Sequence, residues 1–437
     1  MKKAMKIICV LLAAAVCLPL AGCMVEPAAP GAGSSKTTDA AGVSSDPSST
    51  AEPATEPVGT DPDPVQPAEP VKITDEIKIG AFDDSLIAFI MKSDLGSENY
   101  MVSPLSLRVA VAMATVGAVG DTQKELLKAL GFETADEMNE WAVGINGLVA
   151  AFEESAKKAN DGHVRKFSVA NSVWHNITGR EPLLDSYIAR AARYYSAAAE
   201  NVAANEIIKK VNEWVNEKTE GMIPSLMRDD YPTDDLDTIL TNALYLKDDW
   251  MLPFEKDATF TDVFTCLSGG ETEKEYMTTD GNFLYFEDEQ TQLVTLRMCC
   301  GVRVTFVLGD LEGIGEKLDK AKNEYVRVKI PKFETETSLD KNELIDFLKA
   351  EGVTLAFDGQ TADFSEMAVE QVFIADIIQK TKIKVDENGL EAAAATAVAM
   401  NSDGEPVPPE KIFFANRPFS YFITLSGEVL FFGQIAE

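Results

Sequence analysis

The pattern of hydrophobic and polar positions is most informative near the C-terminus. Residues 373–385 end in alternating apolar and charged positions, which predicts a strand with one buried face. Residues 413–432 predict two or more further strands. The segment between them, residues 388–411, is far longer than the usual connection of a few residues, and such loops are generally functional or disordered. The pattern therefore indicates one long loop as the candidate functional segment.

This loop begins with small residues. The alanines at 392–395 have good helix propensity, but Gly389 before them and Pro406 after them argue against a long stable helix. Small side chains can also enter between two existing strands without a steric clash. A surface loop or short helix without a role is the alternative interpretation.

Two other patterns predict elements of the fold. The amphipathic spacing of Phe82, Leu86, Phe89 and Ile90 predicts a helix. Residues 294–307 alternate like a strand and include Cys299 and Cys300, so we expect one of these cysteines to face the core.

The N-terminus has the parts of an export signal. Lysines at 2, 3 and 6 precede an apolar run at residues 7–20, and Leu20-Ala21-Gly22-Cys23 follows and resembles a bacterial lipobox. We expect a signal peptide at residues 1–22 and a diacylated Cys23 as the mature N-terminus. An ordinary signal with a coincidental cysteine is the alternative.

The next stretch has the composition of a disordered tether. Residues 24–79 contain no aromatic residue and are rich in Pro, Ala, Ser, Thr, Asp and Glu, so they bury too little apolar surface to offset the entropy of ordering. We expect a tether at residues 23–75, with an end-to-end distance of roughly 40 Å, and a folded domain at residues 76–437.

Charge and composition limit the partners and sites that we expect. The net charge is −32, and no Lys/Arg-rich cluster appears, so nucleic acid is not an expected partner. The acidic cluster at 229, 230, 234, 235 and 237 lacks the glycine and terminal glutamate of a calcium loop, so we expect no metal site. Once Cys9 and Cys17 leave with the signal and Cys23 is lipidated, Cys266, Cys299 and Cys300 remain, and we expect no disulfide framework.

The sequence offers little for catalysis. Its only histidines are His163 and His175, and neither lies in a Gly-x-Ser-x-Gly or His-Glu-x-x-His motif. A Ser-His-Asp triad is recognised by geometry, so it stays open at this point.

Several motifs, in one order along the chain, resemble those of the serpin family. Residues 387–398 resemble the hinge of the serpin reactive loop, and residues 414–419 with 430–433 resemble the family's C-terminal signature. Further matches are residues 99–106, residues 211–223, residues 241–247 with Trp250, Pro253 and Phe254, and residues 330–333. The resemblance runs from about Ala81 to Glu437.

The resemblance implies an α+β fold, the serpin fold, with about nine helices around three β-sheets and an exposed reactive-centre loop at residues 388–411. It implies a suicide inhibitor of a serine protease, or alternatively of a cysteine protease, rather than an enzyme. After the protease cuts the loop, the loop inserts into the large sheet and the protease remains in a covalent one-to-one complex. We expect a monomer without a cofactor.

The resemblance also assigns site residues. The hinge comprises Glu387, Gly389, Leu390, Glu391, Ala392, Ala393, Ala394, Ala395 and Thr396. The shutter and breach of the large sheet comprise Ser103, Ser106, Asn242, Gln379 and Trp250. Two residues depart from the family: Leu390 replaces the usual Thr or Ser, which would slow the first step of insertion, and Gln379 replaces a frequent histidine, which puts pH-sensitive opening there in doubt.

The reactive bond follows from the family's spacing after Glu387. That spacing predicts Asp403-Gly404, with Met400-Asn401 as the alternative. An acidic bait suits a protease with a basic specificity pocket, whereas Met400 suits a chymotrypsin-like or elastase-like enzyme.

Two other functions stay open. One is a non-inhibitory serpin that serves as a cell-surface binding protein, and the other is a structural or adhesive lipoprotein. In each case we expect an exported protein, either lipid-anchored to the outer face of a bacterial membrane or released outside the cell.

Overall fold

The computed structural model describes residues 68–233, 236–340, 342–390 and 409–437. The chain divides into two units, residues 1–60 and 61–437, and every described residue belongs to the second.

A six-stranded sheet contains the strand that leads into the long loop. Its order is β10, β11, β12, β4, β2, β3, and the long strands β4 and β2 are largely buried. β2 and β4 pair antiparallel from Lys166↔Lys247 to His175↔Thr238. The strands are β2 (Lys166–Asn176), β3 (Ala198–Val202), β4 (Thr238–Asp249), β10 (Phe333–Leu339), β11 (Ile374–Val385) and β12 (Gly389–Leu390).

A nine-stranded sheet contains the other strands, in the order β1, β15, β14, β8, β7, β6, β9, β13, with β5 on β6. The family resemblance implies three sheets, but hydrogen bonding joins two of them here, because the long β6 pairs with β9 along residues 276–285 and with β7 along residues 284–287. The strands are β1 (Tyr100–Val102), β5 (Phe260–Thr265), β6 (Glu271–Glu287), β7 (Thr291–Arg297), β8 (Arg303–Gly309), β9 (Lys322–Pro331), β13 (Lys411–Phe414), β14 (Phe419–Leu425) and β15 (Glu428–Ile435).

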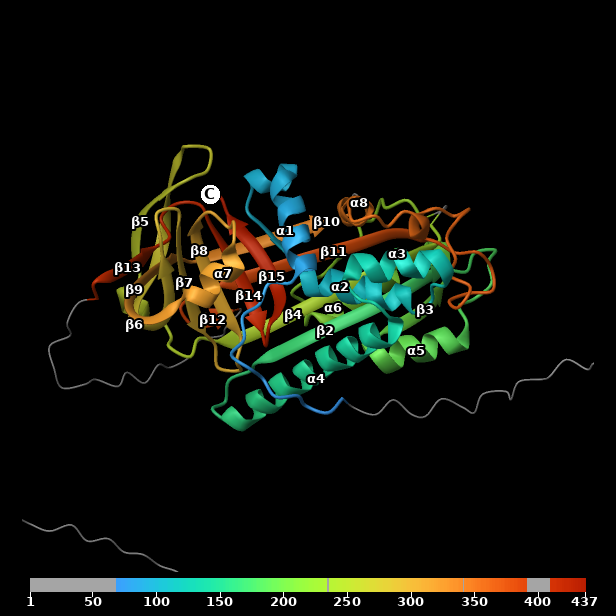
Figure 1. The fold of residues 1–437 in the computed structure, drawn as a ribbon, viewed down its shortest axis with the longest axis horizontal. Helices are drawn as coiled ribbons and strands as arrows, with labels where there is room; N and C mark the ends of the chain where they lie inside the picture. The colour runs from blue at the N-terminus through green and yellow to red at the C-terminus, as the bar shows by residue number, and fades with distance from the viewer. Residues whose placement is uncertain (1–67, 234–235, 341, 391–408) are drawn as a thin grey trace, which may run out of the picture. The chain divides into compact units, whose positions relative to one another are not determined.

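Eight α-helices lie in the described residues, close to the number expected (Figure 1). The predicted helix at Phe82 is confirmed as α1, and it buries Phe82, Leu86 and Ile90. The helices are α1 (Ala81–Lys92), α2 (Pro104–Thr115), α3 (Gly120–Leu130), α4 (Ala135–Ala159), α5 (Asp185–Tyr195), α6 (Ala204–Lys218), α7 (Ile314–Lys320) and α8 (Glu343–Ala350). Among the residues described, no helix combines the length and apolarity that crossing a membrane requires.

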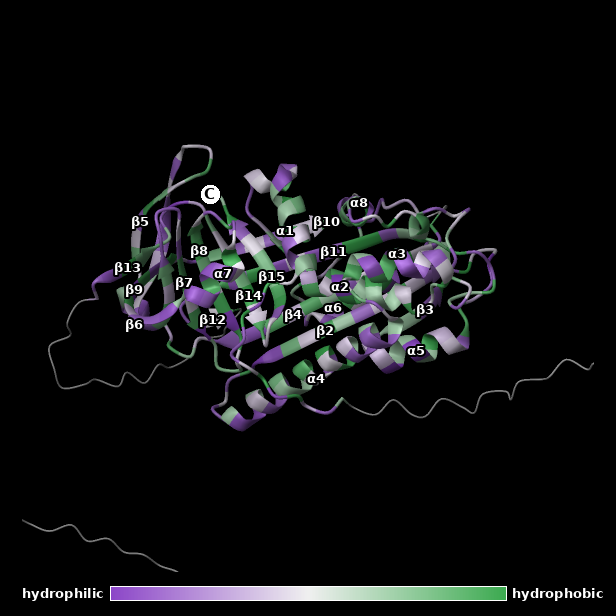
Figure 2. Ribbon diagram, viewed as in Figure 1, coloured by the Kyte–Doolittle hydropathy of each residue, from purple (hydrophilic) through white to green (hydrophobic). Residues whose placement is uncertain are grey.

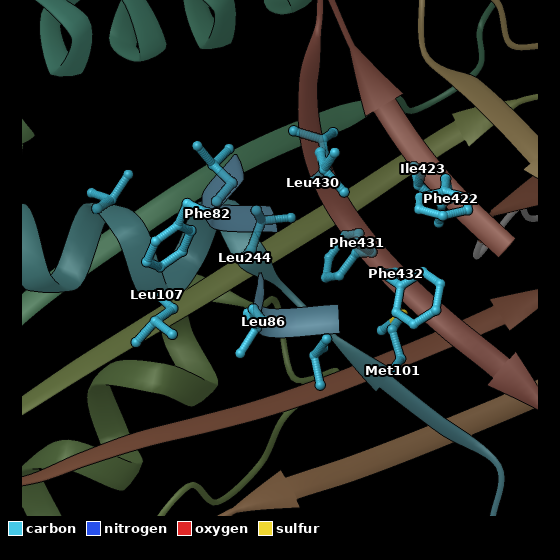
Figure 3. Packing of buried hydrophobic residues seen from close by; sticks show 14 of the residues in the cluster. Phe82, Leu86, Met101, Leu107, Leu244, Phe422, Ile423, Leu430, Phe431 and Phe432 are labelled. Carbon is cyan, nitrogen blue, oxygen red and sulfur yellow. The ribbon is translucent and has the colours of Figure 1, made fainter. Parts of the chain in front are cut away.

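The two faces of the six-stranded sheet bury different cores. On one face α6 places Ile207, Val211 and Val215, spaced by one helical turn, in a small cluster with Trp174 and Ala243. The other face belongs to the main core, where side chains from α1, α2, β4, β14 and β15 meet (Figure 3). Helix α4 also contributes to this main core, and Figure 2 shows hydrophobic and polar residues alternating along it.

Residues before 76 contact the folded domain. Val71 N donates to Gly147 O of α4 at 3.2 Å, and Thr74 N donates to Ser426 Oγ at 2.8 Å. Asp75 pairs with the buried guanidinium of Arg303. Residues 71–75, at the end of the expected tether, thus pack on the folded domain.

The expected strand at residues 294–307 is wrong. β7 ends at Arg297 and β8 begins at Arg303, so Cys299 and Cys300 lie in the turn between them. Gly301 adopts φ +92° in this turn, a conformation that favours glycine. One cysteine does face the core, because Cys300 is buried and Cys299 is exposed.

Candidate functional site: the loop hinge and the seam that receives it

The first residues of the long loop form a strand inside the six-stranded sheet. β12 lies antiparallel to both neighbours: Leu390 is opposite Val385 of β11 and Asp248 of β4, and Gly389 is opposite Asp249. β12 therefore separates β4 from β11 at one end of the sheet, which we call the upper end.

At the lower end β4 and β11 pair directly. Their parallel ladder runs from Ile374↔Thr238 to Gln379↔Asn242. Among the described residues, no ladder pair joins residues 243–247 of β4 to residues 380–384 of β11. The seam between β4 and β11 thus has three parts. β12 lies between the strands at the upper end, the strands pair directly at the lower end, and no ladder pair of the described residues joins the stretches between the two ends.

Gly389 is required by a close approach of two backbones. An added Cβ would lie 2.8 Å from Asp249 Cα and closer still to the carbonyl oxygen of Asp248. Any side chain at this position would force the strands apart. Leu390 beside it is 1% exposed and packs in the main core, so its bulk is accommodated at the start of the hinge.

The turn before β12 is fixed by Trp250. Its indole Nε1 donates to Asp386 O and its backbone N donates to Asn388 O, both at 2.9 Å. Asn388 N also donates to the Asp386 carboxylate at 2.8 Å. The predicted role of Trp250 at the opening of the sheet thus has a geometric basis.

Glu387 is anchored by charge. Its carboxylate accepts a hydrogen bond from Thr259 Oγ1 at 2.8 Å and lies 3.4 Å from Lys332 Nζ. Burial alone would raise the pKa of this carboxyl, but hydrogen bonds from its own backbone N–H and from Thr259, together with the Lys332 ammonium, hold the pKa below its ordinary value.

At the lower end Gln379 bonds to Ser103 with both ends of its amide. Its Oε1 accepts from Ser103 N at 2.8 Å, and its Nε2 donates to Ser103 O at 3.0 Å. Ser103 Oγ donates to Leu430 O at 2.6 Å and also caps α2 by accepting from Ser106 N. Glutamine therefore satisfies a buried donor and a buried acceptor at the position where the family resemblance implies a frequent histidine.

A second buried chain of hydrogen bonds joins α2 to β4 and β2. The Ser106 hydroxyl donates to Asn242 Oδ1, and Asn242 Nδ2 donates to Asn171 Oδ1. The structure brings together Ser103, Ser106, Asn242 and Gln379 as predicted, and it adds Asn171, which the sequence analysis missed. The strand also contains Ser168, Ser172 and His175, so the sequence of β2 does not single out Asn171.

Both histidines have partners. His163 Nδ1 lies 3.0 Å from Asp249 Oδ2 near the upper end. His175 is fully buried between Thr238 Oγ1 and Glu181 O, and burial lowers its pKa. Among the hydrogen bonds of the described residues, neither imidazole pairs with a serine hydroxyl.

The remaining predicted site residues lie outside the described residues. They are Cys23 of the expected lipid anchor, hinge residues Glu391, Ala392, Ala393, Ala394, Ala395 and Thr396, and reactive-bond candidates Met400, Asn401, Asp403 and Gly404.

Comparison with known proteins identifies the family. The serpin (serine protease inhibitor) family matches residues 81–437. A putative serpin-Z12 of Oryza sativa subsp. japonica is 32% identical over 383 residues, covering 78% of this chain and 85% of that protein. A leukocyte elastase inhibitor of Equus caballus is 28% identical over 374 residues, covering 78% and 93%. The native structure of tengpin, a thermophilic serpin, superposes with a TM-score of 0.69 at 27% identity, covering 85% and 97%. The chain therefore belongs to the serpin family, a family of serine protease inhibitors.

Proposed function

We propose that this protein inhibits a serine protease as a suicide substrate, by insertion of its cleaved loop between β4 and β11. The position of β12 is the observation that supports this function most strongly. Gly389 and Leu390 already pair with β4, and Leu390 also pairs with β11, in the antiparallel sense that further insertion requires. A loop without a role in the sheet would not need glycine at Gly389.

The register of β12 indicates where the next residues would go. Continued without a shift, Ala392 would lie opposite Leu246 and Ile383, and Ala394 opposite Leu244 and Thr381. Thr396 would reach Asn242 and Gln379, the pair that begins the lower ladder. The alanines would thus fill the unpaired part of the seam, and every later residue would have to break β4–β11 pairs.

The same register gives Glu391 charged neighbours. Its partners would be Lys247 on β4 and Lys384 on β11, one on either side. A carboxylate between two ammonium groups is favourable in a sheet, because directly opposite unlike charges stabilise it.

The protease itself catalyses the first step, which is the formation of the acyl-enzyme. The serine Oγ of the protease attacks the carbonyl carbon of the bait residue, the peptide C–N bond breaks, and the new amine takes the proton that the serine loses. If insertion is faster than hydrolysis of the ester, the protease remains acylated on the inhibitor in a one-to-one complex. A cysteine protease is the alternative target, through a thioester.

We place the reactive bond at Asp403-Gly404, with Met400-Asn401 as the alternative. The first would suit a protease with a basic specificity pocket and the second a chymotrypsin-like or elastase-like enzyme. We also propose that the protein acts outside the cell, anchored by a diacylated Cys23 at the outer face of a bacterial membrane.

Intact-mass spectrometry under denaturing conditions tests this function. The chain without residues 1–23 would be mixed with serine proteases of differing specificity, and with the same proteases blocked at the active serine as a control. We expect a species with the mass of protease plus inhibitor minus the C-terminal fragment, and the missing mass locates the bond. Clean cleavage with free, active protease in every mixture would contradict inhibition and favour a non-inhibitory binding protein.

A further inference from the structure

The upper end of the seam contains a cluster of charged side chains. Arg165 has a side chain that is only 2% exposed, and its Nε lies 2.7 Å from Asp249 Oδ2 and 3.6 Å from Asp248 Oδ1. Its Nη2 lies 2.7 Å from Asp161 Oδ2. His163 completes the cluster through its contact with Asp249. Three carboxyl groups therefore share one guanidinium and one imidazole, which leaves negative charge in excess when all three are ionised.

Asp248 is the most buried acid of this cluster. Its side chain is 0% exposed, and it accepts hydrogen bonds from Asp249 N at 2.9 Å and Cys300 N at 3.0 Å. Burial raises the pKa of Asp248 to about 7, because the loss of water outweighs the hydrogen bonds from the Cys300 and Asp249 amides and the attraction of Arg165. Burial raises the pKa of the neighbouring Cys300 thiol, and partial loss of water around the sulfur of surface residue Cys299 raises its pKa to about 11, so both thiols remain neutral in this range.

The hinge contributes to this burial. Leu390 is the partner of Asp248 in the β12–β4 ladder, and partners in an antiparallel ladder point to the same face of the sheet. Alternation along β4 places Asp248 on the face of Leu244 and Leu246, which is the face of the main core. Leu390 is itself 1% exposed. Leu390 in the β12–β4 ladder thus covers Asp248 with apolar surface. Departure of Leu390 would expose Asp248 to water.

We propose that Asp248 is a proton-dependent catch for the hinge, meaning a side chain whose protonation controls whether Leu390 stays between β4 and β11. Protonated Asp248 favours the seated state, in which Leu390 lies between these strands. Ionised Asp248 favours the released state, in which Leu390 has left them. The physical basis is reciprocity: if seating Leu390 raises the affinity of Asp248 for a proton, protonation raises the affinity of the seam for Leu390 by the same factor. The inference rests on the proposed function, because it assigns a pH dependence to the hinge of that same mechanism.

The sign follows from the direction of the shift. An acid whose pKa is raised in the seated state contributes fully to seating below its pKa in the released state, near 4 for an exposed aspartate. That contribution is lost as the pH rises towards the seated-state value of about 7. Each unit of difference between the two pKa values weakens seating tenfold.

Hydrogen exchange of the Gly389 and Leu390 amides measures seating without any protease. The full-length protein in detergent would be followed from pH 4 to pH 8, with rates corrected for the intrinsic pH dependence of exchange. We expect protection to fall progressively from pH 4 to pH 7 in the natural protein. In Asp248→Asn, which mimics the neutral acid, protection should stay high at every pH.

Three further variants test whether Asp248, rather than another titratable group, causes the pH dependence of hinge protection. Leu390→Thr removes apolar cover, so the pH range of the change should move to lower pH even if Asp248→Asn does not fold. Asp83→Asn removes another buried acid, with a pKa raised to about 6 by burial on α1 away from the hinge, and should leave the profile unchanged. His163→Gln should also leave it unchanged, although an imidazole ordinarily titrates in the same range.

Several results would overturn the inference: flat protection in the natural protein, a pH dependence that persists in Asp248→Asn, or one that disappears in His163→Gln. Protease adducts formed by a protein with flat hinge protection would preserve the proposed function and remove this inference. A pH-dependent hinge in a protein that traps no protease would support the catch and contradict inhibition.

Discussion

The two ends of the seam between β4 and β11 are built differently. At the upper end, β12 lies between the strands, glycine allows the backbones to approach, and the neighbouring groups are ionisable. At the lower end, the strands pair directly and are braced by neutral groups, among them Gln379, Ser103 and Asn242. The upper end is thus built to admit a strand and to respond to charge, whereas the lower end is held by direct strand pairing and by hydrogen bonds among Gln379, Ser103 and Asn242, whose side chains do not titrate.

This difference implies an order of events. A loop that enters the seam would extend β12 through the unpaired part first and meet resistance only at Asn242 and Gln379. The lower end would then set how far insertion proceeds before cleavage, and the upper end whether it starts.

The largest expected effect comes from weakening the lower end. Asn242→Ala leaves the Ser106 hydroxyl and the Asn171 amide without their buried partner, at roughly 1–3 kcal/mol for each group. We expect the native state to lose about 2–6 kcal/mol of stability, seen as a lower urea midpoint.

Asn323→Ala on the exposed side of β9 is the matched control and should stay within about 0.5 kcal/mol. Equal midpoints for the two variants would show that the lower end does not depend on this network.

A smaller effect should follow from a substitution that blocks the place of β12 at the upper end of the seam. Gly389→Ala places a Cβ against the Asp248 and Asp249 backbones and should cost the seated hinge about 1–3 kcal/mol. Because a hinge that cannot seat leaves more time for hydrolysis, we expect a larger fraction of cleaved inhibitor without adduct, measured by denaturing gel.

Gly144→Ala in α4, where a Cβ meets nothing within 4 Å, is the control and should trap protease as the natural protein does. Undiminished trapping by Gly389→Ala would contradict the role given to β12.

The smallest effect concerns the anchor before the hinge. Lys332→Met removes one of the groups that lower the pKa of Glu387, and a partly exposed pair is worth at most about 1 kcal/mol. A lowered pKa in the folded state adds stability above the ordinary value of 4.5 and loses it as the pH falls through the folded-state value. The variant should therefore lose stability near pH 7 and little at pH 3.

Urea midpoints at the two pH values measure this difference. Lys209→Met, from an exposed pair with Glu213 on α6, serves as the control and should change neither midpoint. A loss of the same size at pH 3 and pH 7 would mean that the charge on Glu387 is not involved.

The sequence predicts some of this architecture and not the rest, for physical reasons. Alternation of apolar and charged residues predicted β11, and the spacing of Phe82 and Leu86 predicted α1, because both signals are local. Family motifs predicted that Ser103, Ser106, Asn242 and Gln379 would meet although they are far apart in the chain.

One local signal was missed: Cys299-Cys300-Gly301 interrupts the alternation of residues 294–307 at the place where the structure has the turn. Features that depend on tertiary contact were also missed. Asn171 is one of several polar residues in β2, and its partner lies on the neighbouring β4, so only the packed structure identifies its role. The acid cluster of Asp248, Asp249 and Arg165 also forms only when the start of β2 and the end of β4 meet.

Hydrogen exchange across the seam, before and after a protease cuts the loop, tests the central claim most directly. We predict that peptides covering residues 243–247 of β4 and 380–384 of β11 become strongly protected after the cut, because a new strand would supply their missing partners, while residues 166–176 of β2 change little. Unchanged exchange in both seam peptides after complete cleavage would contradict insertion between β4 and β11.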